Sequence, residues 1–77
     1  MEIQVIVFGQ LTEITGSGLI RLTGISDSDN LLNLLNEKFP ALKDSKFAIA
    51  IDKKIVRSNT PVSQTSTIVL MPPFSGG

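Results

Sequence analysis

One stretch of the chain, ending at Phe39, has the residue spacing of an amphipathic helix. Leu31, Leu34 and Leu35 recur with Phe39 at intervals of three and four residues, which places them on one helix face. The segment 26–29, Ser-Asp-Ser-Asp, precedes this stripe and supplies side chains that accept hydrogen bonds from the first free amides of a helix. We expect the helix to end at Phe39, because a proline follows it.

The remaining apolar residues fall in short runs rich in isoleucine and valine, which predict β-strands. In the first run Ile3, Val5 and Val7 alternate with Ile6 and Phe8, so each set lies on its own face of a sheet. Residues 10–15 fit either a loop or a short helical turn. The strand predictions are residues 2–8, 19–23, 47–51, 54–57 and 67–71.

This order, β-β-α-β-β-β, predicts an α+β domain. One amphipathic helix over one face of a mixed five-stranded sheet buries both apolar surfaces with the fewest elements. We expect residues 1–71 to form this domain and residues 72–77 to form an extended, flexible tail. No internal repeat or second domain is visible in the sequence.

The composition excludes several classes of chemistry. The chain has no cysteine and no histidine, so it has no disulfide, no thiolate nucleophile and neither of the usual transition-metal ligands. Glu13, Asp27 and Asp29 could be imagined as a site for a hard cation, but helix capping explains Asp27 and Asp29 better. We therefore expect no metal site.

Charge and hydropathy indicate neither a nucleic acid nor a membrane as partner. Seven basic residues balance seven acidic ones and are scattered, with Lys53 and Lys54 as the densest pair in an expected hairpin turn. The apolar runs are far shorter than the roughly 20 residues of a membrane span. The first ten residues open directly into a strand pattern without a basic leader, so we expect a cytoplasmic protein.

The C-terminal segment combines rigid and side-chain-free residues. Pro72 and Pro73 stop the last strand and favour an extended chain. Gly76 and Gly77 have no side chains, so the chain end can enter a narrow pocket of a partner. Six residues reach about 20 Å when extended. Taken alone, two terminal glycines are equally compatible with simple fraying.

Three segments of the chain resemble the small subunit of molybdopterin synthase, a ubiquitin-like sulfur carrier of the MoaD/ThiS family. The ending 71–77, Met-Pro-Pro-Phe-Ser-Gly-Gly, is similar to the family's terminus of an apolar residue, two prolines, any residue, Ser or Thr, and two glycines. Residues 7–13 and 50–56 resemble the segment after the family's first strand and its later hairpin. Asp52 stands where the family usually has asparagine. The resemblance spans the whole chain and implies the ubiquitin-like β-grasp fold.

The resemblance implies a carrier cycle centred on the carboxylate of Gly77, with Gly76 giving access. An activating enzyme would use ATP to form a glycyl adenylate, and a sulfur donor would convert it to a C-terminal 1-thioglycine. The thiocarboxylate would then give its sulfur to cyclic pyranopterin monophosphate in the large synthase subunit. The implied assembly is a heterotetramer of two small and two large subunits. The small subunit is then a non-catalytic carrier with no permanently bound cofactor.

A docking surface is expected on the sheet face that the helix leaves uncovered. Ile6 and Phe8 lie on that face if the helix covers Ile3, Val5 and Val7. The full set of predicted partner-binding residues is Ile6, Phe8, Ile55, Met71, Pro72, Pro73, Phe74 and Ser75.

Three alternatives stay open on the sequence. The carrier could serve thiamine synthesis or tRNA thiolation, which use the same fold and the same Gly-Gly end. It could be a ubiquitin-like modifier joined through its terminus to lysines of target proteins. It could also be a plain interaction module with an inert tail.

Overall fold

The β-branched runs form the strands of one mixed sheet, and the leucine-rich stretch forms the main helix. A computed structural model describes residues 2–72. Its elements in chain order are β1 (Glu2–Val7), α1 (Leu11–Thr15), β2 (Leu19–Thr23), α2 (Ser28–Lys38), the 3-10 helix η1 (Pro40–Asp44), β3 (Ala48–Ile51), β4 (Lys54–Ile55) and β5 (Ile68–Met71).

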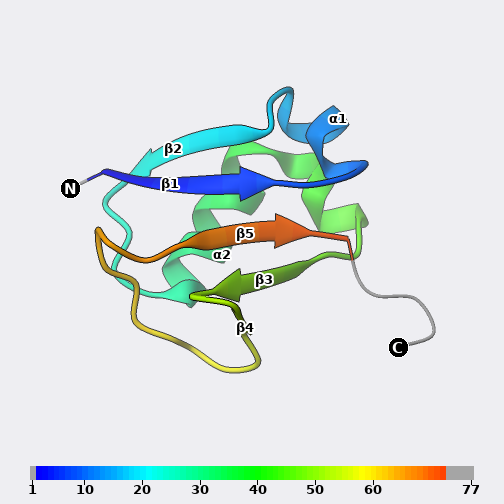
Figure 1. The fold of residues 1–77 in the computed structure, drawn as a ribbon. Helices are drawn as coiled ribbons and strands as arrows, with labels where there is room; N and C mark the ends of the chain where they lie inside the picture. Colours follow the sequence, from blue (N-terminus) through cyan, green and yellow to red (C-terminus); the bar gives the residue numbers. More distant parts are fainter. Residues whose placement is uncertain (1, 73–77) are drawn as a thin grey trace.

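The first and last strands lie side by side in the middle of the sheet. The strand order is β2-β1-β5-β3-β4, and β1 pairs with β5 in parallel through Val5 opposite Ile68 and Val7 opposite Leu70 (Figure 1). The other neighbouring pairs, β1–β2, β3–β5 and β3–β4, are antiparallel. The sheet is therefore the predicted mixed five-stranded one, and β1 and β2 are antiparallel neighbours.

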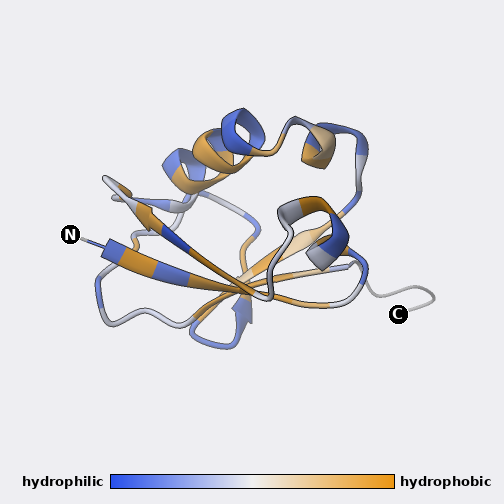
Figure 2. Ribbon diagram, turned by 90° about the horizontal axis from the view of Figure 1, so that it is seen from above, coloured by the Kyte–Doolittle hydropathy of each residue, from blue (hydrophilic) through white to orange (hydrophobic). Residues whose placement is uncertain are grey.

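Helix α2 covers one face of the sheet (Figure 2). Asp27 is its N-cap, and the Asp27 carboxylate accepts the N–H of Asn30 at 2.8 Å. The helix ends as predicted at Phe39, whose N–H donates to the carbonyl of Leu35. Leu31 and Leu35 are fully buried, whereas Leu34 is only partly buried. The buried stripe of the helix is thus narrower than the leucine pattern alone indicates.

The core fills the space between α2 and the inward faces of β1, β2, β3 and β5. Three of its residues come from segments without a predicted strand or helix: Ile25 before α2, Leu42 of η1, which is fully buried, and Val62 of the long loop. The sequence pattern predicts no strand or helix in residues 40–45 and 58–66, yet each of these two segments contributes an apolar side chain to the core. The largest fully buried side chains are Leu31, Leu35, Leu42, Ile68, Leu70 and Val5.

Hydrogen bonds attach the long loop before β5 to the start of α2. The N–H of Ser28 donates to the carbonyl of Thr60 at 2.7 Å, and the N–H of Thr60 donates to Ser28 Oγ at 2.8 Å. Asn59 Oδ1 accepts the N–H of Asp29 at 3.0 Å. These bonds satisfy free amides at the first turn of α2 and hold the loop against the domain.

The β3–β4 hairpin has a strained two-residue turn. Asp52 and Lys53 have φ angles of 52° and 71°, which is the left-handed backbone of a type I′ turn. Asp52 Oδ1 also accepts the N–H of Thr67 at 2.9 Å, which ties the turn to the start of β5. The family usually has asparagine at this position, and its side-chain oxygen can accept the same hydrogen bond. Aspartate in place of asparagine therefore preserves the turn.

Two expectations about shorter elements differ from the structure. Residues 10–15 contain a short helix, α1, so the helical alternative is the correct one. Strand β4 has two residues in place of the expected four, Lys54 to Arg57. The chain leaves the sheet edge after Val56, whose N–H still donates to the carbonyl of Ile49.

Replacing the N-cap, Asp27→Ala, removes the acceptor for the Asn30 amide and the acidic charge at the start of α2. We expect the free energy of unfolding to fall by about 1 kcal/mol, within a range of about 0.5–2 kcal/mol. Urea unfolding followed by far-UV circular dichroism measures the change. Asp44→Ala, at the end of η1, is the matched control. An equal loss in both variants would contradict the capping role.

The turn strain predicts a stabilising substitution. Lys53→Gly removes the steric cost of a side chain at φ 71° and should raise the free energy of unfolding by about 0.5–1 kcal/mol. Lys54→Gly, one residue later in β4, should instead lower it, because that position has strand geometry. Thermal unfolding of the two variants separates the effects. A destabilised Lys53→Gly protein would show that the turn is not strained.

Candidate protein-docking site

The sheet face opposite α2 carries a row of apolar side chains that crosses all of its strands. Residues directly paired on neighbouring strands point to the same face. Ile6 pairs with Leu19 on β2 and with Val69 on β5. Ala50 pairs in turn with Val69 and with Ile55 on β4. We call this set the sheet-face row: Leu19, Ile6, Val69, Ala50 and Ile55.

Two larger side chains extend the row toward the end of β5. Phe8 follows β1 on the same face as Ile6, its N–H donates to the carbonyl of Leu70 at 2.9 Å, and its side chain is 53% exposed. Met71 pairs with Ala48 and is partly buried. Three residues of the sheet-face row, Ile6, Leu19 and Ile55, are 37–40% exposed. The sheet-face row with Phe8 and Met71 forms an apolar surface, which we call the docking patch.

The opposite end of the same face is polar. Gln4 pairs with Arg21, and Glu2 pairs with Thr23. All four residues are exposed. The face is therefore divided along the strands, with its apolar half at the end where β5 leads into the tail. Exposed apolar surface confined to one end of a face is the distribution that marks an interaction site.

The structure brings together the docking residues predicted on the sheet. Ile6, Phe8 and Ile55 are exposed on the uncovered face, as expected, and Met71 lies beside them. Sequence reasoning missed Leu19, Val69 and the buried Ala50. The signal for Val69 was its alternation with Ile68 and Leu70. Leu19 had no such signal, because it is the first residue of its strand and its membership of the patch depends on pairing with Ile6.

The root of the tail lies against the turn that follows β1. Gly9 has a φ angle of 64°, and a Cβ built on it would lie 2.9 Å from Cγ of Pro72. Such a separation is too short for two carbon atoms, so the approach of Pro72 depends on glycine at this position. The contact places Pro72 next to Gly9. The residue before Gly9 is Phe8, the most exposed side chain of the docking patch.

The predicted chemistry lies just beyond the part of the chain that the structure describes. Pro73, Phe74, Ser75, Gly76 and Gly77 fall outside residues 2–72. The roles predicted for them, and the division into a domain of residues 1–71 and a tail of residues 72–77, therefore stay predictions.

The described residues offer no cluster of metal ligands. Within residues 2–72, no group of three or more Asp or Glu side chains is placed to hold a metal ion. Asp27 acts as the N-cap of α2, as the capping interpretation expects. Each helix in the same part of the chain is too short or too polar to cross a lipid bilayer.

Solved structures of small ubiquitin-like proteins match the whole chain. The small archaeal modifier protein 1 of Methanosarcina acetivorans superimposes with a TM-score of 0.77 at 27% identity, covering 99% of this chain and 96% of the other. The protein of the same name from Haloferax volcanii matches with a TM-score of 0.77 and 100% coverage of both chains, but at 20% identity it supports the fold alone.

A third structure connects the chain with a molybdopterin-converting factor. It is the complex of subunits 1 and 2 of that factor from Helicobacter pylori, matched with a TM-score of 0.73 at 29% identity and 100% coverage of both chains. The family model of the ThiS family matches residues 5–77, which is nearly the entire chain. These matches confirm the ubiquitin-like β-grasp fold that the family resemblance implies. The chain belongs to the ThiS family of small ubiquitin-like sulfur carriers, which includes the MoaD type.

Proposed function

We propose that this protein is the sulfur-carrying small subunit of a molybdopterin synthase and carries sulfur as a thiocarboxylate on Gly77. The observation that carries the proposal is the position of the docking patch. The parallel pairing of β1 with β5 places Phe8 and Met71 at the same end of the sheet as Pro72, where the tail begins. When a partner binds this patch, Pro72, where the tail begins, therefore lies at the edge of the interface.

The reaction requires no catalytic side chain on the carrier. The Gly77 carboxylate attacks the α-phosphate of ATP on the activating enzyme, which gives an acyl adenylate and releases pyrophosphate. A sulfur donor then attacks the acyl carbon, so the carbon–oxygen bond to AMP breaks and a carbon–sulfur bond forms. The resulting thiocarboxylate is a strong nucleophile. Its sulfur bonds to a carbon of cyclic pyranopterin monophosphate in the large subunit. Water then cleaves the bond between this sulfur and the carbonyl carbon of Gly77, which leaves the sulfur on the pterin and regenerates the carboxylate.

Two findings support the molybdopterin function over other sulfur-transfer pathways. The segment from Met71 to Gly77 has the Pro-Pro and Gly-Gly pattern of that small subunit. The Helicobacter pylori relative was solved in complex with subunit 2 of its converting factor, which favours a large-subunit partner here. The chain has no cysteine or histidine, which fits a carrier in any of these pathways because the partners then supply the catalytic groups. We place the cycle in the cytoplasm, in a heterotetramer of two small and two large subunits.

The similarity to archaeal modifier proteins favours a second function, attachment of the same C-terminus to lysines of target proteins. Both functions begin with the same adenylate, and they differ in the final acceptor. Isopeptide-linked adducts recovered by mass spectrometry from cells that express the tagged chain would support attachment. An adduct-free lysate, with the thiocarboxylate present, would leave sulfur transfer as the function.

Intact-mass spectrometry tests the first half of the cycle. After incubation with the activating enzyme, ATP and a sulfide donor, the protein should gain about 16 Da, the difference between sulfur and oxygen. A chain that lacks Gly77 should show no gain, because its terminal carboxylate, on Gly76, ends one residue short of the position that the activating enzyme adenylates. An unchanged mass in the complete chain would refute the proposal.

Phe8→Asp tests the docking patch. The substitution places a charge in the centre of an apolar contact, and it should weaken binding to the large subunit by about 2 kcal/mol or more, roughly thirtyfold. Phe8 is 53% exposed, so the fold should be retained. Isothermal titration calorimetry measures the affinity, and circular dichroism checks the fold.

The matched control for this experiment is Thr23→Asp. Thr23 is exposed on the same sheet face, at its polar end, so the variant adds the same charge outside the patch. We expect Thr23→Asp to bind like the parent protein. Equal affinities for all three proteins would show that the partner binds elsewhere.

A further inference from the structure

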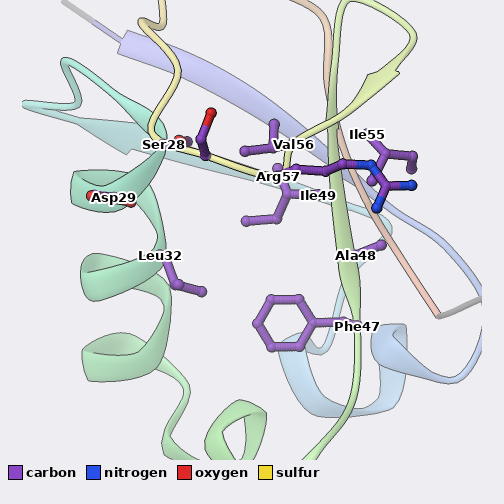
Figure 3. Close-up of a pocket in the computed structure, with 10 residues that line it drawn as sticks. Ser28, Asp29, Leu32, Phe47, Ala48, Ile49, Ile55, Val56 and Arg57 are labelled. Carbon is purple, nitrogen blue, oxygen red and sulfur yellow. The ribbon is translucent and has the colours of Figure 1, made fainter.

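A groove lies on the helix side of the sheet, between α2 and the β3–β4 hairpin (Figure 3). It has a volume of about 490 Å³. Its apolar lining includes Leu32 of α2, Phe47 and Ile49 at β3, and Val56 after β4. Leu32 and Phe47 point toward each other across the groove in Figure 3. Leu32, Phe47 and Val56 pack against the core but are only partly buried, so each keeps apolar surface open to a ligand.

The same groove borders an open edge of the sheet. Strand β4 pairs with Ala50 and Ile51, and the N–H of Val56 donates to the carbonyl of Ile49. Phe47 directly precedes β3, and continuing the two-residue repeat of the strand by one residue points its N–H and carbonyl to the same side as those of Ile49. Among residues 2–72, no strand pairs with Phe47 on that side. An extended segment can therefore add to the sheet there by backbone hydrogen bonds.

The hairpin wall of the groove is basic. Four of the seven basic residues of the chain lie within residues 46–57, where Asp52 is the sole acidic residue. The Asp52 carboxylate already accepts the N–H of Thr67. Arg57 lines the groove, and Lys54 lines an adjoining hollow of about 420 Å³ that continues from it past Ile55, Val56, Arg57 and Ser58.

The opposite wall carries the one acidic side chain that lines the groove, Asp29 at the start of α2. The charges of the groove are therefore separated. Anionic groups are attracted to the hairpin side and repelled from the helix side, which gives an acidic ligand a defined orientation.

We propose that this groove binds an extended, acidic segment of a partner protein. The segment adds as a strand at the free edge beside Phe47, with alternate apolar side chains between Leu32 and Phe47 and with carboxylates toward Arg57 and Lys54. A helical ligand would leave the backbone groups of Phe47 unpaired, so the open edge favours an extended one. The groove lies on the face covered by α2 and shares Ile55 with the docking patch, so it leaves Ile6, Phe8, Met71 and the root of the tail free for a second partner.

A peptide titration followed by ¹H–¹⁵N NMR tests this inference on the full chain. The probe is a capped peptide of about six residues with alternating valine and glutamate, the length of an ordinary strand. We expect saturable shifts at the amides of Phe47, Val56 and Arg57. The same peptide with lysine in place of glutamate should not bind.

The matched variants are Arg57→Glu and Arg21→Glu. Both reverse one exposed charge, but Arg21 lies on β2, at the other edge of the sheet. Arg57→Glu should weaken the peptide by about five- to tenfold, the effect of replacing an attraction with a repulsion at a rim position. Arg21→Glu and Phe8→Asp should leave the affinity unchanged.

Three outcomes would overturn the inference: no saturable shift at millimolar peptide, equal affinities of the two arginine variants, or shifts confined to Ile6 and Phe8. Shifts at the groove that depend on protein concentration without peptide would also overturn it, since a second copy of the chain would then be the occupant. None of these outcomes bears on the sulfur-carrier proposal, which depends on the other face and on Gly77.

Discussion

The parallel pairing of the first strand with the last is the constraint on which the rest of the structure depends. Val5 opposite Ile68 and Val7 opposite Leu70 bring the two ends of the chain into the centre of the sheet. Three of these four residues, Val5, Ile68 and Leu70, are among the largest fully buried side chains, so the same contacts form the floor of the core. A domain this small buries only about 60% of the surface that its unfolded chain exposes, so its stability depends strongly on these few core contacts.

This pairing also determines where on the sheet the C-terminal segment begins. Because β5 is central, its end is surrounded by neighbours, and the segment that follows leaves the sheet beside Phe8 and the turn at Gly9. At this end of the sheet, exposed apolar side chains from β1, β2 and β4 surround the end of β5. A terminal strand at the edge of a sheet would place its end beside a single neighbour. The central position of β5 therefore places Pro72, which follows it, next to the docking patch.

Local features of the fold could be predicted from the sequence, and long-range ones could not. The cap at Asp27, the stripe through Leu31 and Leu35, and the alternation in β1 each depend on neighbours within a few residues. The strand order does not, because nothing local states that Val5 will meet Ile68. Leu19 was missed for the same reason, because its place in the patch depends on its cross-strand partner, Ile6. Leu42 was missed because a lone leucine in a five-residue segment has no periodicity to reveal its burial.

The central claim is that a synthase partner covers the patch around the root of the tail. Cross-saturation NMR on isoleucine methyl groups tests this claim directly. The protein is labelled at its isoleucine methyls and bound to an unlabelled large subunit of molybdopterin synthase. The account predicts that saturation passes to Ile6 and Ile55, the two exposed isoleucines of the patch. A complex that forms without saturation of Ile6 and Ile55 would contradict it.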